Sequence, residues 1–253
     1  MTTTLGLPEA IQACLFDLDG VVTRTAVVHA AAWKETFDAF LHAREGAGFR
    51  PFDAGEDYDE YVDGRPRADG VRTFLASRDI HLPEGGPDDP PDAPTVHGLG
   101  NRKNEILLEK IRTEGVRPYD GTLHYIEAAR ARGLRTAIVS SSANTRDVLR
   151  SIGAEHLFDV RIDGVVAAER GLPGKPRPDT FLAAARDLGV PPTRAAVFED
   201  ALAGMDAGRA GNFGYVVGVD RVGQTDALYA HGADVVVRDL EDLADLRQRG
   251  GRA

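Results

Sequence analysis

The sequence predicts an α/β protein with a Rossmann-like parallel sheet and a helical domain inserted after the first strand. Three observations lead to this class. Short apolar runs alternate with helical patterns along most of the chain. Several of these runs are apolar throughout, as strands covered on both faces require. From about residue 25 to residue 117 the alternation stops, and no strand signal appears there.

The strands of the core are expected where β-rich apolar segments are bounded by turn residues. In chain order they are QACLFDLDG (12–20), LRTAIVSSS (134–142), RAAVFED (194–200), FGYVVGVD (213–220) and ADVVVRDL (233–240). Core helices are expected where apolar residues recur at helical spacing and the pattern ends at glycine. These segments are 122–133, 144–153 and 179–189.

The inserted segment has its own helical pattern. Residues 27–44 and 101–115 are predicted to be helices, and residues 79–100, rich in proline, glycine and aspartate, are predicted to form a long surface loop. We therefore expect a core domain of residues 1–24 and 117–253, with a helical cap domain of residues 25–116.

Composition narrows the function classes. The 253 residues carry a formal charge of −10, which argues against a polyanion such as nucleic acid as the partner. A single cysteine, Cys14, excludes an internal disulfide and a cysteine-based zinc cluster. No segment is apolar over the length of a bilayer, and the first residues lack the pattern of a signal peptide. The expectation is a cytoplasmic globular protein with no membrane or obligate protein partner.

Polar residues collect where the predicted strands end, which is where open α/β sheets place their chemistry. Acid pairs at two such ends suit a hard cation such as Mg²⁺, which prefers oxygen ligands. Each feature alone also has a structural explanation, since an Asp-x-Asp can form a turn and serines can cap a helix. The residues concerned are Asp17, Asp19, Ser140, Ser141, Ser142, Lys175, Glu199 and Asp200.

Four segments in order resemble the motifs of the haloacid dehalogenase superfamily of phosphotransferases: DLDGVVT (17–23), VSSSAN (139–144), GKPRPD (174–179) and VFEDALAG (197–204). The resemblance spans residues 11 to 220 and includes the helical cap. Within the superfamily the chain is most similar to the β-phosphoglucomutases, through residues 17–33, the serine-rich second motif and NRKN (101–104).

The resemblance implies that Asp17 is the nucleophile, which forms an aspartyl-phosphate, and that Asp19 is the general acid and base. It also implies that Lys175 and Ser140 bind the phosphoryl oxygens. Further substrate or phosphate contacts are expected at Gly20, Ser142 and Asn144.

The resemblance further implies a Mg²⁺ ion held by Asp17, Asp200, Glu199 and the backbone carbonyl of Asp19. Whether Glu199 binds the metal directly or orients a metal-bound water stays open at this point.

Three cap residues match mutase positions. His29 is expected to help close the site, and Arg67 to hold the distal phosphate of the substrate, with Lys103 in a similar role. Trp33, four residues after His29, is expected to pack in the cap core. Closure would use hinges near Val22–Thr25 and Val116–Asp120.

Some positions depart from the mutase pattern, namely Arg24, Asp63 and Gly70, and the loop at 79–100 is longer than in compact members. These departures leave the identity of the sugar open. The sequence favours a mutase that interconverts β-glucose 1-phosphate and glucose 6-phosphate through a bisphosphate. A sugar-phosphate phosphatase is the alternative, and a non-catalytic phosphate-binding protein is third.

Overall fold

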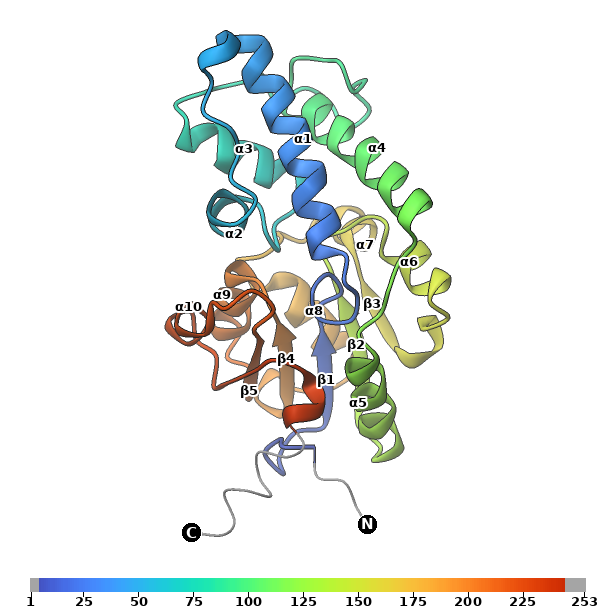
Figure 1. Cartoon of the computed structure of the whole chain (residues 1–253). Helices are drawn as coiled ribbons and strands as arrows, with labels where there is room; N and C mark the ends of the chain where they lie inside the picture. The colour runs from blue at the N-terminus through green and yellow to red at the C-terminus, as the bar shows by residue number, and fades with distance from the viewer. Residues whose placement is uncertain (1–4, 244–253) are drawn as a thin grey trace. The chain divides into compact units, whose positions relative to one another are not determined.

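The computed structural model of the chain describes residues 5–243 and contains one six-stranded parallel sheet (Figure 1). The strand order is β3-β2-β1-β4-β5-β6, and every neighbouring pair is parallel. The strands are β1 (Ala13–Phe16), β2 (Arg135–Val139), β3 (Val160–Ile162), β4 (Ala195–Glu199), β5 (Tyr215–Val219) and β6 (Val235–Val237). The predicted α/β class with a parallel sheet is confirmed.

The helices of the core connect these strands. They are α5 (Asp120–Ala131), α6 (Thr145–Ser151), α7 (Gly164–Glu169), α8 (Asp179–Leu188), α9 (Leu202–Ala210) and α10 (Thr225–Ala230), with 3₁₀ turns η2 (Glu155–Leu157) and η3 (Pro192–Arg194). The glycines that end α5 and α8 in the sequence pattern lie just beyond these helices, at Gly133 and Gly189, both with positive φ.

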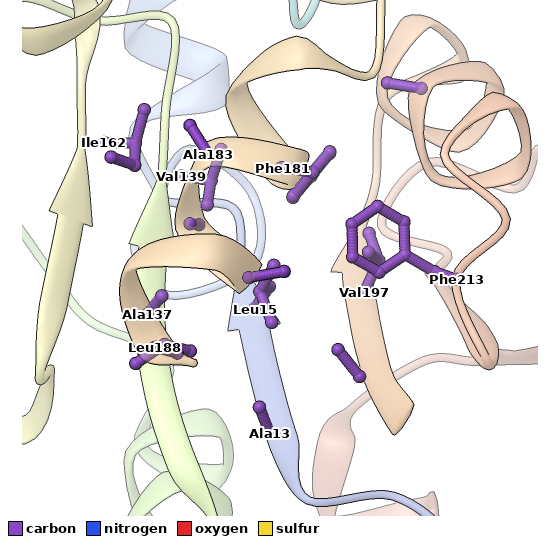
Figure 2. Packing of buried hydrophobic residues seen from close by; sticks show 14 of the residues in the cluster. Ala13, Leu15, Ala137, Val139, Ile162, Phe181, Ala183, Leu188, Val197 and Phe213 are labelled. Atoms are coloured by element: carbon purple, nitrogen blue, oxygen red, sulfur yellow. The ribbon is translucent and has the colours of Figure 1, made fainter. Parts of the chain in front are cut away.

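Helices cover both faces of the sheet, which explains why its strands are apolar throughout. On one face Leu15, Val139 and Val197 pack with Phe181 of α8 (Figure 2). On the other face Phe16 of β1 stacks on Phe198 of β4 with 4.4 Å between ring centroids, and the Tyr125 ring of α5 meets Phe16 edge-on. Side chains of a strand alternate between faces, so consecutive residues serve both layers.

The inserted segment is a helical unit with a core of its own. Its helices are α1 (Ala26–Glu45), α2 (Glu56–Tyr61), α3 (Arg67–Ser77) and α4 (Val96–Glu114), with the 3₁₀ turn η1 (Gly46–Gly48). The rings of Phe37, Phe52 and Phe74 pack together, and Trp33 stacks on Phe37 at 5.0 Å. Trp33 thus packs in this core, as expected from the sequence. Among residues 5–243, no helix has both the length and the apolar character needed to cross a membrane.

The structure differs from the sequence prediction in several elements. Strand β3 was not predicted because its three residues include the charged Arg161, whereas the equally short β6 is apolar throughout. Helices α2 and α3 were not separated from the surrounding polar segment. The predicted loop at 79–100 ends earlier, at Thr95, because the Thr95 side chain accepts a hydrogen bond from the Gly98 amide and starts α4 at Val96. Asn101 then donates to the carbonyls of Pro87 and Asp89, which orders the loop.

The two core segments that flank the inserted unit, one before it and one after it, pair with each other. Thr23 forms a β-bridge with Pro118, and the Arg24 amide donates to the Arg117 carbonyl at 2.9 Å. The chain divides into two compact units at these segments: one holds the residues before Thr25 and after Val116, and the other holds Thr25–Val116.

Candidate active site

The site begins with two neighbouring strands that end in acids. Strands β1 and β4 pair with Phe16 opposite Phe198, and the Asp17 amide continues the ladder by donating to the Phe198 carbonyl at 2.9 Å. Glu199 is the last residue of β4. The register of the sheet therefore brings Asp17 and Glu199 side by side at its carboxyl edge.

Asp19 does not lie on an extended strand with Asp17, so the strand predicted over residues 12–20 extends too far. Strand β1 ends at Phe16, and the backbone bends at Leu18. Asp19 belongs to a turn in which it forms a β-bridge with Thr23. The two aspartates consequently have different surroundings: Asp17 is only 6% exposed, whereas Asp19 is half-buried.

Lys175 joins the ends of three strands. Its Nζ atom lies 2.5 Å from Asp17 Oδ1 after β1, 2.5 Å from Glu199 Oε1 at the end of β4, and 3.1 Å from the carbonyl of Val139 at the end of β2. The ammonium donates hydrogen bonds to Asp17 and to the Val139 carbonyl, and its third contact is an ion pair with Glu199. With the side chain 1% exposed, Lys175 is fixed in place by these bonds.

Glu199 is held from two sides. Its Oε2 atom accepts hydrogen bonds from the amides of Asp200 and Ala201, each at 3.2 Å, while Oε1 faces Lys175. Gly204 in α9 makes room for this carboxylate, because a Cβ atom at that position would lie 2.0 Å from Glu199 Cδ. Gly204 was missed as a site residue in the sequence, although the glycine-punctuated segment after VFED was a signal for it.

Asp200 packs directly against the turn that follows Asp19. Gly20 has φ of +92°, and a Cβ atom there would lie 1.6 Å from Asp200 Oδ2. Only glycine fits this position for both reasons. The carbonyl of Asp200 accepts a hydrogen bond from Gln224 Nε2 at 3.0 Å. Gly20 thus makes room for the Asp200 carboxylate, and Gln224 is a further residue that the sequence did not reveal.

The site has an excess of negative charge. One oxygen from each of Asp17, Glu199 and Asp200 lies within 4.8 Å of the others, and all three residues are buried. Three carboxylates against the single ammonium of Lys175 leave two formal negative charges. Burial raises the pKa of Asp17 well above its usual range, and the charges of Glu199 and Asp19 raise it further, against the opposing effect of Lys175. An all-oxygen donor set with two uncompensated charges fits a divalent cation such as Mg²⁺.

The serine-rich loop after β2 is organised by its own side chains. Ser140 Oγ accepts a hydrogen bond from the Ser142 amide at 3.1 Å, and Ser142 Oγ accepts one from the Asn144 amide at 3.2 Å. The carbonyl of Ser142 accepts from the Gly164 amide, which ties this loop to the start of α7. Helix α6 begins directly after Asn144. The predicted phosphate contacts at Ser140, Ser142 and Asn144 therefore lie on a preformed loop.

The other three predicted site residues belong to the inserted unit. Lys103 Nζ lies 3.1 Å from His29 Nδ1 and 4.9 Å from the centre of the Trp33 ring. Arg67, the first residue of α3, passes close to α4, where a Cβ atom at Gly100 would lie 3.2 Å from Arg67 Cγ. Partial burial lowers the pKa of the Arg67 guanidinium from its usual value.

The fifth strand end carries a further residue that sequence reasoning missed. Arg221 follows β5 by two residues, and its Nε atom donates to the Gly20 carbonyl at 2.9 Å. The rule that polar residues gather at strand ends would have identified it, had it been applied to β5 as it was to the earlier strands.

Comparison with known proteins agrees with this geometry. The family model of the haloacid dehalogenase-like hydrolases matches residues 11–212. A β-phosphoglucomutase of Mycobacterium tuberculosis is 56% identical over 94% of both chains, and one of Bacillus subtilis is 33% identical over 92% of both. The crystal structure of a Clostridium difficile β-phosphoglucomutase superposes with a TM-score of 0.73 at 25% identity, covering 95% of this chain and 96% of that one. The chain belongs to the haloacid dehalogenase-like hydrolase family.

Proposed function

We propose that the protein is a Mg²⁺-dependent β-phosphoglucomutase, which interconverts β-glucose 1-phosphate and glucose 6-phosphate through β-glucose 1,6-bisphosphate. The observation that carries the proposal is the buried cluster of Asp17, Lys175, Glu199 and Asp200, in a chain that shares 56% identity with a β-phosphoglucomutase over nearly its whole length. The cluster supports phosphoryl transfer, and the similarity supports the sugar substrate.

In the proposed reaction an Asp17 carboxylate oxygen forms a bond to phosphorus while the bond from phosphorus to the sugar oxygen breaks. Lys175 holds Asp17 Oδ1, which fixes the orientation of the nucleophile. Asp19, half-buried and outside the lysine cluster, gives a proton to the departing sugar oxygen. It takes a proton from the sugar hydroxyl that attacks the aspartyl-phosphate next. Distinct environments thus support distinct roles for the two aspartates.

Asp17 and Asp200 are the residues proposed to hold Mg²⁺, with the Asp19 carbonyl. When bound, the ion offsets the repulsion between an anionic carboxylate and an anionic phosphate. Glu199 has one oxygen on Lys175 and the other on two backbone amides. These bonds favour an orienting role for Glu199 over direct metal binding, the question that the sequence left open.

The decisive measurement is a coupled assay that follows glucose 6-phosphate and free phosphate separately. With β-glucose 1-phosphate, Mg²⁺ and a catalytic amount of β-glucose 1,6-bisphosphate, we expect glucose 6-phosphate to form faster than free phosphate. Asp17→Asn should abolish both products, because an amide is a poor nucleophile. Asp19→Asn should retain substrate binding and lose about 10²–10⁴-fold in turnover.

Release of phosphate without glucose 6-phosphate would replace the mutase with a phosphatase. Full activity in excess chelator would contradict the Mg²⁺ site. Mass mapping of the phosphorylated enzyme provides the control for the nucleophile, since a phosphorylated peptide that lacks Asp17 would exclude that assignment.

A second prediction concerns Arg67, which we propose grips the distal phosphate of the bisphosphate. Arg67→Ala should lower mutase turnover by orders of magnitude, since loss of one partner of a buried charge pair costs about 2–5 kcal/mol. Hydrolysis of a small phosphate ester, which has no second phosphate, should change little. Arg112→Ala, at an exposed position of α4 outside the NRKN segment, is the matched control. An equal loss of both activities would mean that Arg67 supports the inserted unit instead.

A further inference from the structure

One arginine on the loop after β5 binds three separate parts of the core. Arg221 Nε donates to the Gly20 carbonyl at 2.9 Å, and a second nitrogen of the guanidinium donates to the Arg238 carbonyl at 2.5 Å and to Asp239 Oδ2 at 3.2 Å. Its Cζ atom lies 3.5 Å from the centre of the Tyr119 ring. The side chain is 15% exposed, so the planar guanidinium makes these contacts largely shielded from water.

The carbonyl that Arg221 holds belongs to the residue directly after the proposed general acid. The Gly20 amide donates to the Thr23 carbonyl at 2.7 Å, and the Gly20 carbonyl receives Arg221. Peptide units are planar, so these two bonds fix the units on both sides of Gly20, including the one it shares with Asp19. Glycine has the widest conformational freedom of all residues. The turn is closed from within by the Val22 and Thr23 amides, which donate to the Leu18 carbonyl, and Arg221 holds its Gly20 carbonyl from outside.

The loop that carries Arg221 is itself firmly held. The carboxylate of Asp220 accepts hydrogen bonds from the amides of Val222, Gly223 and Gln224, and from the Thr225 hydroxyl. Arg221 thus extends from a fixed backbone. The neighbouring Asp200 follows β4, and its carbonyl is bound by Gln224 of the same loop.

Arg221 also connects the turn to the segment that returns from the inserted unit. The Tyr119 ring on which it stacks belongs to this segment, and the Tyr119 amide donates to the Val22 carbonyl at 2.9 Å. The Arg24 guanidinium lies over the same ring at 4.8 Å. Arg24, one of the positions that depart from the mutase pattern, therefore has a structural role beside Tyr119.

We propose that Arg221 is a positioning residue, which acts through the Gly20 carbonyl to keep Asp19 oriented for proton transfer to the departing sugar oxygen. This inference rests on the proposed function, because it assumes that Asp19 is the general acid. It assigns Arg221 no contact with substrate, so its effect must appear in the steps that need the proton.

The test compares two phosphoryl donors in Arg221→Ala, Arg221→Lys and wild type. β-Glucose 1-phosphate needs a proton on its leaving oxygen, whereas acetyl phosphate releases acetate, which leaves without one. Arg221→Ala should lower kcat with β-glucose 1-phosphate by about 10–100-fold, the usual range for a residue that orients a catalytic group, with little change in KM. Single-turnover phosphorylation of Asp17 by acetyl phosphate should fall far less.

Arg221→Lys keeps the positive charge but loses the planar set of N–H donors, so its kcat should lie between those of wild type and Arg221→Ala. If Arg221→Ala does not fold, as judged by thermal unfolding, Arg221→Lys carries the same donor comparison. Arg186→Ala, at an exposed position of α8, is the control and should match wild type.

Equal losses with both donors, or rates equal to wild type with both, would overturn the proposal. A wild type that only hydrolyses β-glucose 1-phosphate would refute the mutase proposal, yet the donor comparison would still test Arg221, with hydrolysis as the readout.

Discussion

At the scale of single residues, two glycines of one helix give opposite predictions. A methyl group at Gly204 would overlap the Glu199 carboxylate, with Cβ 2.0 Å from Cδ, whereas at Gly208 the nearest side-chain atoms lie at 3.4 Å, an ordinary contact. Alanine in a helix is intrinsically about 1 kcal/mol more stable than glycine. The same substitution is therefore expected to favour the helix at both positions and to disturb the site at only one.

Gly204→Ala should displace Glu199 from Lys175 and lower kcat by about 10–100-fold, as loss of an orienting group does. Overpacking should also cost about 1–3 kcal/mol of unfolding free energy. Gly208→Ala should keep its activity and unfold at the same temperature or slightly higher. Steady-state kinetics and thermal unfolding of both variants check this, and a fully active Gly204→Ala would show that the position of Glu199 is not critical.

Residue types at strand ends were the part of the site that the sequence could predict. Asp17, Glu199 and Asp200 lie together in the structure with Lys175, as the motifs indicated. The hydrogen bond from Lys175 to the Val139 carbonyl could not be predicted, because every residue has a backbone carbonyl and the sequence does not show which one will accept a bond. The same holds for the steric role of Gly20 against Asp200, which depends on how two loops approach.

At the scale of elements, the loop between β5 and α10 has a built-in sensitivity to acid. Burial alone raises the pKa of Asp220, but hydrogen bonds from Thr225 and from the amides of Gly223, Gln224 and Val222 bring it below its ordinary value of 3.8. A carboxyl group whose pKa is lower in the folded state than in the unfolded chain stabilises the folded state at pH values above the unfolded pKa. This stabilisation is lost as the pH falls from 3.8 through the lower pKa that Asp220 has in the folded state.

Asp220→Asn should lower the free energy of unfolding at neutral pH by about 1–3 kcal/mol, since it weakens bonds to a charged acceptor. Between neutral pH and about pH 3 the variant should lose less stability than wild type, because it lacks the group that is protonated there. Urea unfolding at several pH values measures both effects. Asp88→Asn, at an exposed position, is the control. Parallel pH curves for wild type and Asp220→Asn would contradict the role of this carboxylate.

Most long helices were predicted well, whereas short elements were predicted only where their apolar pattern was clear, as in α6 and β6. Helices α1, α5 and α8 have enough turns for an apolar face to repeat, and the sequence located them within a few residues. The short β3 contains the charged Arg161, and the six residues of helix α2 are mostly acidic, so neither showed an apolar pattern. The start of α4 was placed too late because HGLG has low helix propensity, whereas the Thr95 cap determines where the helix begins.

At the scale of the whole molecule, the order of elements was predictable because parallel strands need connections that cross over the sheet. The order of the strands across the sheet was not. That β1 lies between β2 and β4 follows only from the assembled sheet, and this placement brings Asp17 beside Glu199. The charge of −10 has no direct bearing on the fold, but within the core it includes the buried acids that favour a dication.

The pairing of Thr23 and Arg24 with Pro118 and Arg117 has a consequence for how such a protein can diversify. Since the chain leaves and returns at neighbouring positions, the core closes the loop with its own hydrogen bonds, whatever lies between. The entropic cost of a longer loop grows only slowly with its length. The inserted unit is thus an exchangeable module: new substrates can be acquired by replacing it, while the machinery for handling phosphorus is inherited unchanged.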